Sequence, residues 1–124
     1  MDRQRKLRIA LADDEADSRR MLARMIAGFG HEVMLVAEDG QTLLEAPLAG
    51  KIDVVVLDLD MPNLDGLATA EEVSRQHIPV ILVSGHPDLD SVVLGEEPLL
   101  AKLRKPVEAR PLQLALERVR EGRP

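Results

Sequence analysis

The sequence predicts a single α/β domain built on a doubly wound, parallel sheet. Short apolar runs of strand length alternate with segments whose apolar residues recur at helical spacing. One run, Val54–Leu57, has four consecutive apolar residues, three of them β-branched, which is typical of a strand buried on both faces of a parallel sheet. The length of 124 residues, with 45% hydrophobic and 31% charged residues, fits one globular domain, 1–124.

The first strand and helix come before residue 31. Leu7–Ala12 is a strand-length run that stops at the acidic residues Asp13-Asp14-Glu15. Gly28 and Gly30 end the helix that follows, because glycine accepts the positive φ of a helix C-terminus. The apolar stripe of this helix consists of Ala16, Met21, Leu22, Met25, Ile26 and Phe29.

The next elements lead to the central strand. Glu32–Ala37 predicts the second strand, and Asp39-Gly40 predicts a turn after it. Thr42–Glu45 predicts a short helical stretch that is interrupted near Pro47. The central strand then runs from Val54 and stops on the carboxylate of Asp58, and Pro62 prevents the chain from continuing the ladder.

The second half of the chain continues the alternation. After a loop at 63–66, a helix is predicted from about Leu67 to Gln76. Pro79–Val83 predicts a fourth strand that ends on Ser84-Gly85-His86, and a short helix is expected at Leu89–Leu94, broken by Gly95 and Pro98. The last two elements are a weak fifth strand, Leu99–Leu103, before Arg104-Lys105-Pro106, and a helix from about Pro111 with Leu112, Ala115, Leu116 and Val119. Alternating strands and helices imply parallel strands with right-handed crossovers.

Composition narrows the function. A net charge of −6 argues against a nucleic-acid partner, and Phe29 is the only aromatic residue, so platforms for base stacking are absent. The chain has no cysteine, which excludes disulfides and thiolate metal sites. The apolar run Ile9–Ala12 is too short for a signal peptide or a membrane span. A cytoplasmic protein with no membrane partner is expected. His31, His77 and His86 lack partners at metal-binding spacing and are expected at the surface or in loops.

Polar residues follow four of the predicted strands. Asp13-Asp14 follow the first, Asp58 ends the third, Ser84 the fourth, and Lys105 follows the fifth. These ends meet at one edge of a parallel sheet, where ligands bind in such folds. Three carboxylates placed together repel unless a cation lies among them, and oxygen-only ligands favour a hard ion such as Mg²⁺. A hydroxyl and an ammonium nearby suit a phosphoryl group, and an Asp carboxylate can be phosphorylated.

The chain resembles the receiver domain of two-component response regulators, the CheY-like superfamily. The residues that carry this resemblance are Asp13-Asp14-Glu15, Asp58, Met61-Pro62, Asp65-Gly66, Ser84-Gly85 and Lys105-Pro106. It implies a flavodoxin-like (βα)5 fold with strand order 2-1-3-4-5. It also implies a signalling domain, rather than an enzyme, that assists its own phosphorylation and dephosphorylation.

The resemblance assigns roles to the strand-end residues. Asp58 would accept a phosphoryl group from a histidine kinase or histidine phosphotransfer protein. Asp14 directly, and Asp13 partly through water, would hold Mg²⁺ together with Asp58 and the backbone carbonyl of Asp60. Ser84 and Lys105 would each contact a phosphoryl oxygen. The helical face of Glu15, Ser18 and Met21 would dock the donor, although Met21 also fits the core stripe.

The chain departs from the family in two places. Lys102 stands where family members usually carry Tyr, Phe or His, and we expect its ammonium to stay in water. The segment between Ser84 and Lys105 is slightly short. Because no output domain follows residue 124, we expect a stand-alone receiver, or one excised from a hybrid kinase, that acts on a downstream effector protein.

Two alternatives compete with this interpretation. A degenerate receiver would bind partners without phosphorylation, but all the phosphorylation residues are present. Asp58-Leu59-Asp60 also resembles the first motif of haloacid-dehalogenase-type phosphatases, where one Asp is the nucleophile and the second an acid/base. Those enzymes carry their metal-binding acids downstream of this motif, whereas Asp13-Asp14 precede it, and Pro62 stands where Thr or Val is expected.

Overall fold

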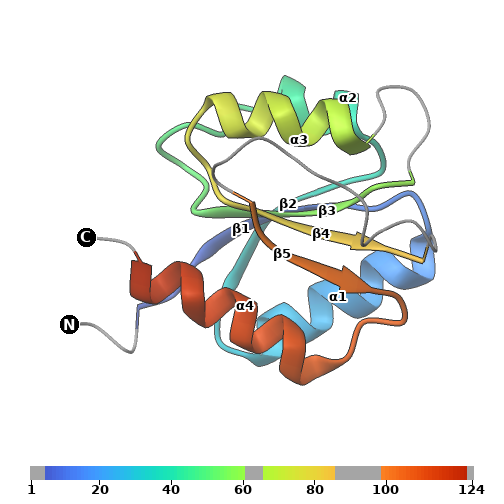
Figure 1. Cartoon of the computed structure of the whole chain (residues 1–124), viewed down its shortest axis with the longest axis vertical. Coiled ribbons are helices and arrows are strands. Elements are labelled where there is room, and N and C mark those ends of the chain that lie inside the picture. The colour runs from blue at the N-terminus through green and yellow to red at the C-terminus, as the bar shows by residue number, and fades with distance from the viewer. Residues whose placement is uncertain (1–4, 61–65, 86–98, 123–124) are drawn as a thin grey trace.

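The computed structural model shows a five-stranded sheet between two layers of helices (Figure 1). The structure describes residues 5–60, 66–85 and 99–122. The strands lie in the order β2-β1-β3-β4-β5, and each adjacent pair is parallel. The predicted fold class and strand order are confirmed.

The described elements follow the predicted alternation. In chain order they are β1 (Arg8–Ala12), α1 (Ala16–Gly28), β2 (Glu32–Ala37), α2 (Gly40–Glu45), β3 (Val54–Asp58), α3 (Gly66–Arg75), β4 (Val80–Ser84), β5 (Leu99–Arg104) and α4 (Ala109–Gly122). The helix expected at Leu89–Leu94 lies outside the described residues. None of the described helices is long and apolar enough to cross a membrane.

Two element starts differ from the sequence-based expectation. Asp39-Gly40 begins α2 rather than forming a separate turn, because the Asp39 carboxylate accepts a hydrogen bond from the Thr42 backbone N–H at 2.8 Å and caps the helix. The last helix, α4, begins at Ala109, so Pro111 lies in its first turn, where the missing N–H of proline leaves no bond unmade.

The sheet has a hydrophobic core on each face. Helices α1 and α4 cover one face, and α2 and α3 cover the other (Figure 1). Successive residues of β3 alternate between the two cores, Val54 and Val56 toward α1 and α4, Val55 and Leu57 toward α2 and α3. All five residues of β3 are buried, which explains why its sequence reads as a continuous apolar run.

His31 lies in the connection between α1 and β2, as expected for a surface or loop residue, but its side chain is buried rather than exposed. Its side chain is only 7% exposed, and its Nδ1 accepts a hydrogen bond from the Leu7 backbone N–H at 3.1 Å. Burial lowers the pKa of His31 from the ordinary value of 6.5, the charge of Arg120 lowers it further, and that of Glu117 opposes the shift. His77, by contrast, is exposed, and His86 lies outside the described residues.

We predict that His31 makes stability pH-dependent. Its folded-state pKa is lowered, so the stability that the neutral ring contributes is present above the ordinary pKa of 6.5 and is lost as the pH falls below it. Urea unfolding at about pH 7.5 and about pH 5.5 should show a greater loss of unfolding free energy for the wild type than for His31→Gln. Other titrating groups are shared by both proteins and cancel in the comparison. If the unfolding free energies of the wild type and His31→Gln differed by the same amount at both pH values, the prediction would be contradicted.

Candidate functional site

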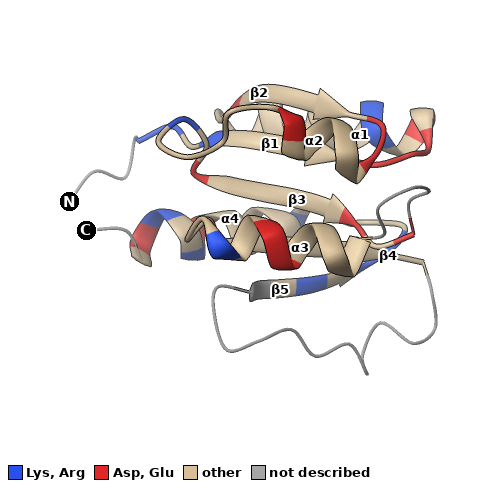
Figure 2. Cartoon of the chain, turned by 90° about the horizontal axis from the view of Figure 1, so that it is seen from above, with Lys and Arg blue, Asp and Glu red and all other residues tan. Residues whose placement is uncertain are grey.

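The carboxyl ends of the parallel strands meet at one edge of the sheet. Asp13 and Asp14 follow β1, Asp58 is the last residue of β3, Ser84 the last of β4, and Lys105 follows β5. Acidic residues lie beyond the arrowhead of β2 and at that of β3 in Figure 2. The strand register brings Asp58 opposite Val83, one residue before Ser84. The topology therefore brings together the residues that the sequence singled out.

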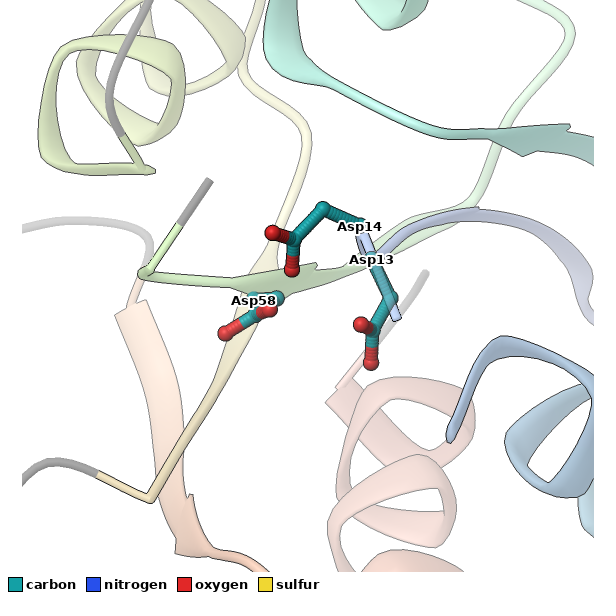
Figure 3. A group of neighbouring side chains, drawn as sticks. All are labelled: Asp13, Asp14 and Asp58. Atoms are coloured by element: carbon teal, nitrogen blue, oxygen red, sulfur yellow. The ribbon is translucent and has the colours of Figure 1, made fainter. Parts of the chain in front are cut away.

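Three carboxylates form the centre of this edge. Asp13, Asp14 and Asp58 each offer an oxygen atom, and these atoms all lie within 4.8 Å of one another (Figure 3). Asp13 and Asp58 are buried, whereas Asp14 is exposed. Two buried carboxylates and one exposed one at this separation repel one another when all are ionised.

The environment of Asp58 opposes its ionisation. The pKa of Asp58 is raised from 3.8 to about 6, mainly because the group is buried, and the neighbouring Asp13 and Asp14 contribute to the rise. Two groups act in the opposite direction: the Asp60 backbone N–H, which donates to Asp58 Oδ1 at 3.1 Å, and the charge of Lys105. The carboxylate is thus held in a site with an excess of negative charge.

Lys105 joins the acidic residues. Its Nζ lies 2.9 Å from Glu15 Oε1, 3.1 Å from Asp13 Oδ2 and 3.4 Å from Asp58 Oδ2. Burial lowers the pKa of Lys105, but hydrogen bonds to Glu15 and Asp13 and the charges of Asp58 and Asp13 outweigh it, so the pKa is raised overall. The ammonium is therefore charged. The peptide bond between Lys105 and Pro106 is cis. Sequence reasoning placed Lys105 here but gave Glu15 no role as its partner.

Ser18 supports Asp13 directly. Its Oγ donates to Asp13 Oδ2 at 2.6 Å, and the Glu15 backbone N–H donates to Asp13 Oδ1 at 2.9 Å. Sequence reasoning assigned Ser18 only to a docking face and missed this contact, although a hydroxyl residue in the first turn after an acidic pair is a signal for it. Met21, on the same helical face, is 41% exposed and so is not core.

Asp60 and Ser84 are linked across the ends of β3 and β4. Ser84 Oγ donates to Asp60 Oδ2 at 2.9 Å. Ser84 is fully buried, and Asp60 is exposed. The expectation for Asp60 concerned only its backbone carbonyl, so the part that its side chain plays was missed.

Gly66 fixes the start of α3 against the end of β3. A Cβ atom at this position would lie 2.4 Å from the Leu59 Cα and 2.8 Å from the Asp58 backbone oxygen, closer than atoms can approach. Only glycine therefore allows this packing, and the Gly66 N–H donates to the Leu59 backbone oxygen at 3.2 Å. This close approach explains the glycine after the central strand, and it braces the backbone that carries Asp58.

The site fits a hard divalent cation. A pocket of about 220 Å³ opens at this edge, and its lining residues are Asp14, Glu15, Asp58, Asp60, Gly85 and Lys105. Four carboxylates and one ammonium line this pocket, and all possible ligands are oxygen atoms. A cation bound there would offset the excess of negative charge.

Comparison with known proteins decides what this site belongs to. The sequence model of the response regulator receiver domain matches residues 9–117. The chain belongs to this family. The assignment favours the receiver interpretation of Asp58-Leu59-Asp60 over the phosphatase one. It makes the chain part of a two-component signalling system.

Curated relatives are longer than this chain. The chain is 33% identical over 120 residues to the transcriptional regulatory protein PdtaR of Mycobacterium tuberculosis, covering 92% of this chain and 58% of PdtaR. It is 36% identical over 85 residues to the DNA-binding transcriptional regulator NtrC of Escherichia coli, covering 67% of this chain and 18% of NtrC. The chain therefore spans less than two thirds of the length of PdtaR and of NtrC.

Solved receiver domains share the fold over nearly their whole length. The receiver domain of NtrX from Brucella abortus superimposes with a TM-score of 0.79 at 32% identity, covering 93% of this chain and 99% of that domain. A response regulator receiver domain protein from Clostridium thermocellum gives a TM-score of 0.78 at 31% identity, covering 91% and 93%. These matches agree with the strand order described above.

Lys102 occupies the position of the usual aromatic residue in this receiver. It lies on β5 opposite Leu82 of β4 and is half-buried. The expectation that its ammonium stays in water on activation concerns a second state and stays a prediction.

We predict that Asp58→Asn stabilises the protein when divalent cations are absent. Because the folded-state pKa is raised from 3.8 to about 6, the folded protein binds more protons than the unfolded chain in that range, and stability falls as the pH rises through it. Above about pH 6 the unfolding free energy of the variant should exceed that of the wild type by on the order of 1 kcal/mol, which corresponds to about 3–5 °C in melting temperature. Solvent at the pocket mouth screens the charges and keeps the gain this small.

The pH and metal dependence of this gain separate it from a general effect. The gain should vanish below about pH 3, where Asp58 is protonated in both folded and unfolded wild type, and should shrink when Mg²⁺ is added. Glu71→Gln, which removes an exposed charge on α3, is the matched control and should change little. Melting curves that place the variant below the wild type at neutral pH in chelator would refute the charge-excess argument.

Proposed function

We propose that this receiver accepts a phosphoryl group on Asp58 from a histidine kinase or histidine phosphotransfer protein, in a Mg²⁺-dependent reaction. The supporting observation is the position of the Asp58 carboxylate, which is 3% exposed at the end of β3, within 4.8 Å of oxygen atoms of the acid pair and 3.4 Å from the Lys105 ammonium. The pocket of about 220 Å³ gives a donor access to it.

In the proposed reaction, a carboxylate oxygen of Asp58 forms a bond to phosphorus as the bond from phosphorus to the donor's histidine nitrogen breaks. The electron pair of the broken bond stays on that nitrogen. Lys105 Nζ, 3.4 Å from Asp58 Oδ2, is placed to pair with a phosphoryl oxygen. Asp13, Asp14, Asp58 and the backbone carbonyl of Asp60 would hold Mg²⁺, which, when bound, neutralises charge on the phosphoryl oxygens.

Asp13 and Asp14 would divide the work of holding the cation. Asp13 already accepts hydrogen bonds from the Glu15 N–H, from Ser18 and from Lys105. Its oxygen atoms have little capacity left for further contacts, which suits binding of the cation partly through water. Asp14 is exposed at the pocket and suits a direct ligand.

Several wider features belong to the same proposal. The domain would be a signalling component rather than an enzyme, would act in the cytoplasm without nucleic-acid or membrane partners of its own, and would pass its signal to an effector protein. The relatives named above are transcriptional regulators, which supports a downstream effector. Phosphorylation separates this proposal from a degenerate receiver that binds partners without it.

Phosphorylation by a small-molecule phosphodonor such as acetyl phosphate tests the acceptor. We expect one phosphoryl group per chain in the presence of Mg²⁺, none in excess chelator, and none in Asp58→Asn, because that variant lacks the attacking carboxylate. The acyl phosphate is read by intact-protein mass and by its loss on treatment with hydroxylamine. Full labelling of Asp58→Asn would show that another residue is the acceptor.

A second experiment tests the donor's docking surface. A pocket of about 370 Å³ beside the site includes Met21, Lys105, Pro106 and Val107 in its lining, so an arginine at Met21 would obstruct a docked helix without touching Asp58. Met21→Arg should slow transfer from a phosphohistidine protein by about tenfold or more, while labelling by acetyl phosphate stays unchanged.

Ser18 is unsuitable as this probe because it hydrogen-bonds Asp13. The matched control is Met34→Arg, because Met34 lies on β2 and is 54% exposed. If Met21→Arg slowed both reactions equally, the effect would come from damage to the site, and docking at this surface would be refuted.

A further inference from the structure

The hydrogen bond between Ser84 and Asp60 has no part in the chemistry derived above. Ser84 Oγ donates to Asp60 Oδ2 at 2.9 Å. Ser84 is the buried last residue of β4, and Asp60 lies two residues after the end of β3 and lines the pocket. The contact therefore joins the end of one strand to the loop that leaves its neighbour, at the mouth of the site.

The Asp60 side chain is held in place by its own backbone. The Asp60 N–H donates to Asp58 Oδ1 at 3.1 Å, and the Leu59 N–H donates to the Val83 backbone oxygen at 3.0 Å. The first bond ties Asp60 to the end of β3, and the second ties Leu59 to β4. The Asp60 carboxylate is thus presented to Ser84 by the same backbone that surrounds Asp58.

A serine hydroxyl has one hydrogen and can donate to one acceptor at a time. Asp60 is a charged acceptor, and hydrogen bonds to charged groups are stronger than neutral ones. While Ser84 donates to Asp60, its hydrogen is not available to a phosphoryl oxygen on Asp58. Phosphorylation would then require Ser84 to exchange one anionic acceptor for another.

We propose that Asp60 is a positioning residue that retains the Ser84 hydroxyl in the unphosphorylated state, so that the phosphorylated state forms at the expense of the Asp60–Ser84 hydrogen bond. This inference rests on the proposed function of Asp58. Asp60 sets how strongly Ser84 supports the phosphoryl group.

Asp60 also acts through its charge, and the two effects can be separated. Its carboxylate lines the pocket together with Asp14, Glu15 and Asp58, so it opposes any incoming anion. Asp60→Asn removes the charge but keeps an oxygen that can accept from Ser84. Asp60→Ala removes both the charge and the acceptor, while the backbone N–H and carbonyl of residue 60 remain in either variant.

The test measures the affinity of the chain for beryllofluoride, a phosphoryl mimic, at fixed Mg²⁺, with amide chemical shifts as the readout. Asp60→Asn should bind more tightly than the wild type because of the lost charge. Asp60→Ala should bind about threefold to tenfold more tightly than Asp60→Asn because the Asp60 acceptor no longer competes for the Ser84 hydrogen. In a Ser84→Ala background the two Asp60 variants should bind equally, since the hydroxyl is absent.

A second readout needs neither the mimic nor the metal. In the free protein, the amide resonances of Ser84 and Gly85 should shift more in Asp60→Ala than in Asp60→Asn. Equal affinities of the two variants in the presence of Ser84 would overturn the retention of Ser84 by Asp60 while leaving the proposed function intact. A wild-type chain that binds no beryllofluoride would overturn both. Asp60 is exposed, so both variants are expected to fold.

Discussion

The contact of the Lys105 ammonium with three carboxylates is the interaction on which the rest of the site depends. Its Nζ reaches Glu15, Asp13 and Asp58 at distances between 2.9 and 3.4 Å. Asp13 and Asp58 are almost fully buried, and without a counter-charge they would be unpaired anions in a poorly solvated place, which is costly. One ammonium does not balance the three carboxylates that it contacts, and burial, together with Asp13 and Asp14, keeps the pKa of Asp58 raised to about 6. The remaining negative charge is what makes the site receptive to a divalent cation.

Such an unfavourable cluster persists because the surrounding fold is rigid. The strand that ends in Asp58 is buried along its whole length, with alternate residues in the two cores. Gly66 brings α3 against the backbone just after that strand, where any side chain would collide. Asp58 therefore cannot move away to relieve its repulsion with the neighbouring carboxylates, and the excess of negative charge remains in the site. The apolar interior and the charged edge are two parts of one arrangement.

The sequence was sufficient to predict the sheet and the edge at which the candidate site residues meet. Parallel strands place their carboxyl ends at one edge, so the residues after each apolar run could be assigned to a common location without any side-chain detail. The missed features depend on side chains that meet from distant elements. His31 follows a helix-ending glycine and looks like a loop residue, yet its partner is the Leu7 N–H. The contacts from Ser18 to Asp13 and from Ser84 to Asp60 likewise depend on rotamers and loop paths, which apolar periodicity does not encode.

The position of Lys102 affects how a change at Ser84 can spread through the molecule. On β5, Ala101 and Leu103 pack against the core under α1 and α4, so Lys102 and Arg104 alternate onto the other side of the strand. Arg104 lies opposite Ser84 itself. An aromatic ring can enter an apolar space vacated by a moving hydroxyl, but an ammonium or guanidinium would lose its hydration there. We therefore expect a signal from Ser84 to spread through the loop that carries Asp60 and through the charges on β5, rather than by the insertion of a ring.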